Sequence, residues 1–143
     1  MSGSASYAQT GPFAGMAGNW SGGGTVTLDD GSSERIRCRS AEAVAAGGEG
    51  LNLTLTCASD SYKFNLKADV VSARGALTGS WSESSRNVAG TLEGRGANGE
   101  FKVVASAAGF SANISLSTRG NKQSVVMRAD SVFKGANISL TKQ

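Results

Sequence analysis

The sequence lacks histidine altogether, and histidine is the side chain most often used for general acid–base catalysis and metal binding. Catalytic triads and imidazole-ligated metal sites are excluded with it. The two cysteines, Cys38 and Cys57, are expected to be consumed in a disulfide, which removes thiolate chemistry as well. We therefore predict that the chain is not an enzyme and that it has no cofactor and no metal site.

Charge and long hydrophobic runs are also scarce. Charged residues make up 17% of the chain, and the net charge of +3 is too small and too scattered to indicate a nucleic-acid partner. No apolar run approaches the length needed to span a membrane. No stretch of helical length has apolar residues recurring every three to four positions, so we expect no substantial helix. We expect a monomer or a weak dimer.

The sequence does contain a strict alternation of polar and apolar residues, most clearly in residues 34–40 and 51–57. Gly47-Gly48 lies midway between Cys38 and Cys57, and a two-residue turn there places the two sulfurs opposite each other. A disulfide implies an oxidising compartment, so we predict a periplasmic or secreted protein. Two buried free thiols are the alternative.

The beginning of the chain has no such periodicity, and residues 1–12 are predicted to be a disordered lead-in. Met1–Ser4 looks like an added leader, and Ala5–Ala8 looks like the end of a secretory signal whose apolar part has been removed. Residues 13–143 are expected to form a single domain, with Phe13 and Met16 the first side chains to dock on it.

The alternation continues through about ten segments separated by turn residues. Hairpin turns are predicted at Asp29-Asp30-Gly31, Arg74-Gly75, Asn98-Gly99 and Gly120-Asn121. These turns pair Val26 with Glu34, Val70 with Gly79, Gly94 with Val103, and Leu116 with Val125. A one-residue slip would turn a whole strand's apolar side chains outward, so the agreement is informative. We predict an all-β fold, an antiparallel up-and-down meander of about ten strands closed into a barrel.

The predicted interior contains both aromatic side chains and many small ones. The outward positions are polar, whereas an outer-membrane barrel needs an apolar outer band, so we expect this barrel to lie in water. Ten strands lined by glycine and alanine should leave either a cavity or a flattened, sandwich-like barrel. We expect Gly79→Leu or Gly90→Leu to fill that space and leave the fold intact.

Gly18-Asn19-Trp20 opens the first predicted strand, and residues 75–83 read Gly-Ala-Leu-Thr-Gly-Ser-Trp-Ser-Glu. With the glycine-rich meander that follows, the chain resembles the calycins: lipocalins, fatty-acid-binding proteins and avidins. It also resembles uncharacterised secreted bacterial proteins that open with a Gly-x-Trp-x-Gly-x-Gly strand. The resemblance implies a small barrel with an interior ligand site. The Thr-Asp-Tyr motif of lipocalins, the capping helices of fatty-acid-binding proteins and avidin's set of ligand-binding side chains are missing, so no ligand is carried over.

Candidate ligand contacts are inward-facing aromatic residues with one glutamate and one methionine, and the alternative for the aromatic residues is a simple core. They are Trp20, Tyr62, Phe64, Trp81, Glu83, Phe101, Phe110 and Met127. Glu83 is expected to orient a polar ligand head or to pair with an arginine at the barrel mouth. Glu34 and Glu42 share the inward parity, but exposure at strand ends explains them.

Two other charged groups are expected to be structural. Asp29-Asp30 is predicted to serve turn chemistry and not calcium binding. Arg35, Arg37 and Arg39 are expected to be a solvated outer face, with an anion or acidic-partner site as the alternative.

The leading hypothesis is a secreted or periplasmic, non-enzymatic barrel that binds a small lipid-like or other hydrophobic molecule inside. The alternative is an interaction module with a filled core, protease-inhibitor-like or envelope-associated, that acts through its loops. A contiguous apolar cavity of a few hundred Å³ would favour the first.

Overall fold

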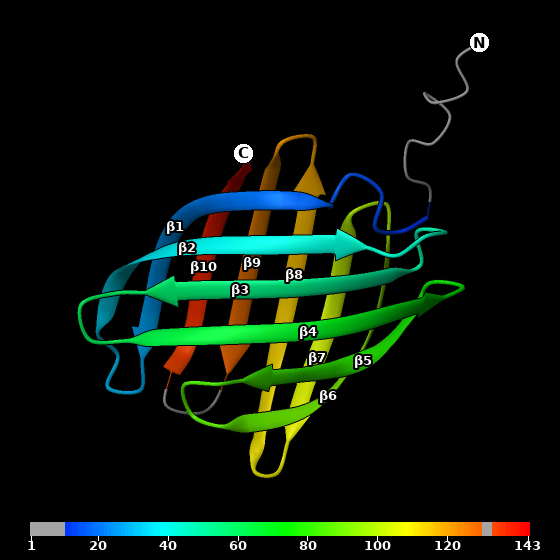
Figure 1. Cartoon of the computed structure of the whole chain (residues 1–143). Coiled ribbons are helices and arrows are strands. Elements are labelled where there is room, and N and C mark those ends of the chain that lie inside the picture. The colour runs from blue at the N-terminus through cyan, green and yellow to red at the C-terminus, as the bar shows by residue number, and fades with distance from the viewer. Residues whose placement is uncertain (1–10, 130–132) are drawn as a thin grey trace.

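A computed structural model describes residues 11–129 and 133–143 as ten antiparallel strands closed into a barrel (Figure 1). Each strand pairs with its neighbours in the sequence, and β1 also pairs with β10. The predicted fold class is confirmed. The strands are β1 (Gly18–Leu28), β2 (Ser33–Val44), β3 (Gly50–Ala58), β4 (Lys63–Ala73), β5 (Ala76–Glu83), β6 (Val88–Ala97), β7 (Glu100–Ala107), β8 (Phe110–Arg119), β9 (Lys122–Ala129) and β10 (Phe133–Lys142).

The described residues contain no helix long and apolar enough to cross a membrane. In Figure 1 the front wall, β1 to β4, crosses the rear wall, β7 to β10, at a steep angle. Of the predicted lead-in, residues 1–10 lie outside the described residues. Only Gly11 and Pro12 of that segment are described.

The predicted register is also confirmed. Val26 pairs with Glu34, Cys38 with Cys57, Val70 with Gly79, Gly94 with Val103, and Leu116 with Val125. Arg74 and Asn98 take positive φ angles of 54° and 55°, as the first residue of a type I′ turn requires. The β2–β3 connection is wider than predicted. The Ala45 amide donates to the Gly50 carbonyl at 2.9 Å, so residues 46–49 form the loop while the cysteine register is kept.

The inward-facing glycines were expected to leave empty space in the interior. The structure contradicts this prediction, because neighbouring backbone atoms lie where their side chains would be. A Cβ atom on Gly79 would lie 2.0 Å from the Asp69 carbonyl oxygen, and one on Gly90 would lie 1.8 Å from that of Ser106. Gly24 in β1 is tighter still, at 1.7 Å from the Asn137 carbonyl oxygen. These glycines allow close approach of neighbouring backbones where the sheet bends. Gly79→Leu and Gly90→Leu would therefore collide with the backbone and would not fill a cavity.

The two ends of the barrel are built differently. Residues 11–17, which we call the lid, form a turn that lies at the end bearing the β2–β3 and β6–β7 loops (Figure 1). The opposite end, which we call the mouth, carries the turns at residues 29–32, 59–62, 84–87 and 108–109. Phe13 and Met16 of the lid are 1% and 0% exposed, which confirms that they dock on the barrel.

Candidate functional site

The barrel encloses a cavity of about 320 Å³ that extends from the lid to the mouth. Its wall is almost entirely apolar and is built by the inward faces of most of the strands, together with Phe13 and Met16. Inward residues of β8 such as Ile114 and Leu116 are only half-buried, although their side chains point into the barrel. These residues of β8 therefore face the cavity and not a packed core.

Seven of the eight predicted ligand contacts line this cavity. They are Tyr62, Phe64, Trp81, Glu83, Phe101, Phe110 and Met127. The eighth, Trp20, does not reach the cavity wall. Its side chain is 1% exposed, and its indole Nε1 donates to the Met16 carbonyl at 2.9 Å. Trp20 thus holds the lid in place.

Several contacts fix the lid across its end of the barrel. The Phe13 ring lies 5.1 Å from the ring of Phe101, measured between centroids. The Gly99 amide donates to the Pro12 carbonyl at 3.2 Å, and Lys142 Nζ donates to the Gly15 carbonyl at 2.9 Å. The lid is tied to both β7 and β10, so this end of the cavity is closed.

A buried polar cluster lies beside the lid. Gln123 Nε2 donates to Glu42 Oε1 and to Thr118 Oγ1, each at 3.0 Å, and Ser40 Oγ donates to Glu42 Oε2 at 2.7 Å. Within the described chain, Gln123 Oε1 is buried without a partner. Burial raises the pKa of Glu42, against the hydrogen bonds from Gln123 and Ser40, which favour the carboxylate.

The expectation that Glu42 is exposed at a strand end is wrong, because Glu42 is only 5% exposed. Its carboxylate accepts hydrogen bonds from Ser40 and from Gln123, and Gln123 is far from Glu42 in the sequence. Ser40 and Gln123 line the cavity, so this cluster is the polar part of the wall at the lid end.

At the mouth, Glu83 is held by the backbone. Its carboxylate accepts hydrogen bonds from the amides of Asn65, Ser85 and Arg86 at 2.8 to 2.9 Å. Burial opposes ionisation of this group, but the three amide donors together outweigh burial and lower the pKa of Glu83. Glu83 is therefore ionised and anchored, and Arg86 Nη1 pairs with it at 3.2 Å.

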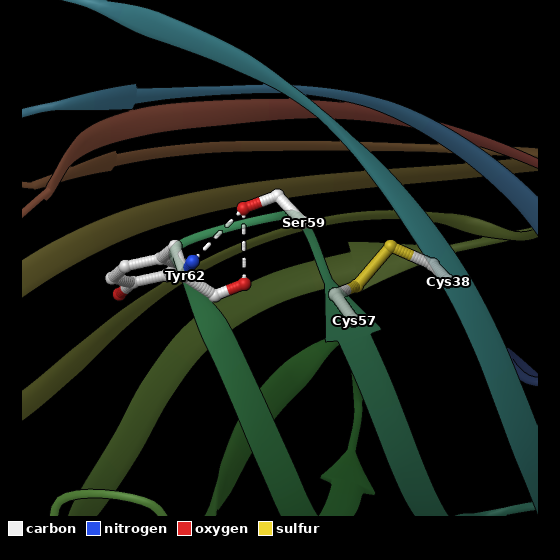
Figure 2. Close-up of a disulfide and its surroundings, with 4 residues drawn as sticks. All are labelled: Cys38, Cys57, Ser59 and Tyr62. Carbon is white, nitrogen blue, oxygen red and sulfur yellow. Dashed lines mark hydrogen bonds between the residues drawn. A yellow bond between two sulfur atoms is a disulfide. The ribbon is translucent and has the colours of Figure 1, made fainter.

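Tyr62 stands on the tight turn that follows β3. Figure 2 shows Ser59 Oγ between the Tyr62 amide and carbonyl, at 3.0 and 3.1 Å, beside the Cys38–Cys57 disulfide. Hydroxyls of Ser59 and Ser61 also donate to the Glu34 carboxylate and lower its pKa. The turn that positions Tyr62 is thus tied to β2 by Glu34, close to the disulfide that joins β2 to β3.

The charged groups on the outer surface are arranged as expected. Arg35, Arg37 and Arg39 are exposed on the outer face of β2. Asp30 Oδ1 accepts from the Ser32 amide at 2.8 Å and from its hydroxyl at 2.6 Å, which is turn chemistry. In the part of the chain that the structure describes, no three acidic or cysteine side chains are grouped to hold a metal ion.

Glu83 pairs with an arginine at the mouth, which was one of its two expected roles, but the sequence does not reveal that this arginine is Arg86. It lies in a polar loop three positions after Glu83, where exposure is the ordinary expectation, and it nevertheless lines the cavity. Its guanidinium lies 4.3 Å from the centroid of the Tyr62 ring. The only available signal was the inward parity of Glu83, which calls for a cation nearby.

No family model matches the chain, and no curated protein matches it. Its structure is similar to the crystal structure of Rv2717c from M. tuberculosis, with a TM-score of 0.73 and 14% identity over 90% of this chain and 92% of that one. It is also similar to the S-type phycobiliprotein lyase CPES from Guillardia theta, with a TM-score of 0.58 and 9% identity over 90% and 88%.

The second similarity corrects the prediction that the chain is not an enzyme. That prediction rested on the missing histidine, but a protein named as a lyase has the same kind of barrel. At these identities the similarity shows the fold alone. The chain is a ten-stranded antiparallel barrel, and its overall fold is similar to those of both solved structures.

Proposed function

We propose that this protein binds a small apolar or amphipathic molecule inside the barrel. The observation that carries the proposal is the cavity of about 320 Å³, which is contiguous and walled by apolar side chains. Its volume falls in the range of small-molecule sites, and its few polar groups are confined to the two ends. A filled core, on which the alternative of an interaction module depended, does not fit this interior.

We further propose that the protein works in an oxidising compartment, the periplasm or the exterior of the cell. The support is the Cys38–Cys57 disulfide, since such bonds persist where thiols are not kept reduced. The disulfide lies next to the turn that carries Tyr62, so the same bond stabilises part of the mouth (Figure 2).

The test is to fill the cavity and measure binding of an uncharged hydrophobic dye, phenylnaphthylamine. Ala105 of β7 and Ala112 of β8 pair with each other across the ladder, and both are buried in the cavity wall. Ala105→Leu and Ala112→Leu should each weaken dye binding about tenfold or more, because the new methyl groups occupy the ligand volume. Ala89→Leu, on the exposed outer face of β6, is the matched control and should bind as wild type does.

Dye binding that is equal in wild type and in both filled variants would contradict the proposal. Thermal unfolding of each variant checks that the barrel is intact, since overpacking costs about 1–3 kcal/mol.

A further inference from the structure

Arg86 is fixed at the mouth by three contacts that leave half of its guanidinium unused. Its Nη1 donates to Glu83 Oε1 at 3.2 Å and to the Lys63 carbonyl at 3.1 Å, and the group stacks 4.3 Å from the Tyr62 ring centroid. Within the described chain, Nε and Nη2 donate to no protein atom. The guanidinium is therefore held through Nη1, and its Nε/Nη2 edge is left without a hydrogen-bond acceptor among the described residues.

The free edge has the geometry of a carboxylate receptor. Nε–H and Nη2–H point the same way from a planar group, and two parallel N–H donors match the two oxygens of a carboxylate. A guanidinium already held by protein contacts loses little freedom when it binds. Partial burial strengthens the interaction, since the Arg86 side chain is 33% exposed.

Among the described residues, no acidic group at the mouth occupies this edge. Both oxygens of Glu83 accept hydrogen bonds from backbone amides, and Glu83 binds Arg86 only through Nη1. The Glu34 carboxylate is occupied by the hydroxyls of Ser59 and Ser61. Among the described residues that line the cavity, Glu83 and Arg86 are the two that carry charge.

The lid end offers the opposite chemistry. There the buried groups include the Glu42 carboxyl and the side-chain oxygen Oε1 of Gln123, which has no partner within the described chain, and both are hydrogen-bond acceptors. A carboxylate at that end would meet these acceptors and, among the described residues that line the cavity there, no free charged donor. The two ends together therefore set the direction of an amphipathic ligand.

We propose that the barrel takes a carboxylate-bearing amphiphile, with its apolar tail in the cavity and its carboxylate on the Nε/Nη2 edge of Arg86. This inference rests on the proposed function and adds the head group and the orientation. The tail contacts the apolar wall, and the head group stays at the mouth, where the ligand enters.

The experiment compares decanoate with decanol, which has the same tail and no charge, by calorimetric titration at neutral pH. Wild type should bind decanoate at least about tenfold more tightly than decanol. Arg86→Gln should abolish this preference, because it should lower the affinity for decanoate about tenfold or more and change the affinity for decanol much less. Arg86→Lys, which keeps the charge and loses the fork, should lose most of the preference. Arg35→Gln, on the exposed outer face of β2, is the control and should keep it.

The possible failures are distinguishable. If neither ligand binds to wild type, the proposed function fails. If decanol binds and decanoate binds no better, or if Arg86→Gln keeps the preference, the cavity function stands and the carboxylate inference is overturned. A full preference in Arg86→Lys would overturn the two-donor geometry, because charge alone would then suffice.

Discussion

The lid end and the mouth of this barrel differ in what covers the cavity. At the lid end a turn of the preceding chain inserts Phe13 and Met16, which are almost completely buried. At the mouth there is no such segment among the described residues, and Tyr62 and Phe110 remain half-buried around the charged pair of Glu83 and Arg86. The lid end is covered by apolar packing, whereas the mouth is bordered by polar and charged side chains.

The two ends also treat a glutamate in opposite ways. Glu42 at the lid end is covered by side chains and keeps a raised pKa, mainly because of burial. Glu83 at the mouth is also largely buried, but three backbone amides lower its pKa. Backbone donors therefore decide the ionisation of a buried carboxyl more than its exposed fraction does.

The largest expected effect on stability comes from removing the buried aromatic side chain of the lid. Phe13→Ala should destabilise the protein by about 3–5 kcal/mol, because the side chain is fully buried against Phe101 and leaves a cavity. Phe110→Ala at the mouth should cost only about 1–2 kcal/mol, since that ring is half-buried. Urea denaturation of the two variants measures the difference, and equal losses would show that the lid does not stabilise the barrel.

The next effect separates the two glutamates by pH. Because the folded-state pKa of Glu83 is lowered, its contribution to stability is present above the ordinary value of 4.5 and is lost as the pH falls through the folded pKa. Glu83→Gln should therefore cost about 1–3 kcal/mol at pH 7 and progressively less in acid.

Glu42 should show the opposite dependence. Its folded-state pKa is raised, so its contribution is fully present below the ordinary value of 4.5 and is lost as the pH rises through the folded pKa. Glu42→Gln should gain stability relative to wild type with rising pH, by less than about 1 kcal/mol. Urea unfolding of wild type and both variants, from neutral pH to below 4.5, tests the two predictions. If the stability difference from wild type changed with pH in the same direction for both variants, the opposite pKa shifts of Glu42 and Glu83 would be wrong.

The smallest effect is spectroscopic. Both tryptophans occur in a Gly-x-Trp-Ser sequence, but Trp81 lines the cavity while Trp20 binds the lid. Binding of phenylnaphthylamine should change the emission of Trp81. Trp81→Phe should remove most of the change in tryptophan emission, and Trp20→Phe should keep it. The reverse result would indicate that the dye binds at the lid end.

The register of the barrel could be predicted because short hairpin turns and strict alternation reinforce each other. The pairing of Cys38 with Cys57 follows from the residues between them, and so does that of Gly94 with Val103 across Asn98-Gly99. The inward parity also placed most of the candidate residues on the cavity wall. Each of these inferences uses only local sequence.

Features that depend on distant segments could not be predicted. Glu42 is buried and bound by Gln123, which stands far along the chain. Gly79 and Gly90 looked like unfilled space because parity shows direction and not the distance to the next backbone. Arg86 lies in a loop, where alternation carries no information.

The seam between β1 and β10 has a consequence for the order in which the barrel is completed. Gly22 pairs with Leu140 and Gly24 with Ile138, residues that stand at opposite ends of the sequence. Such pairings form slowly, since the whole intervening chain must be organised first. While the protein is being synthesised, the second edge of β1 has no partner until β10 has left the ribosome. A chain that stalls before that point exposes strand edges to other chains, so the ten residues of β10 protect the first strand from aggregation.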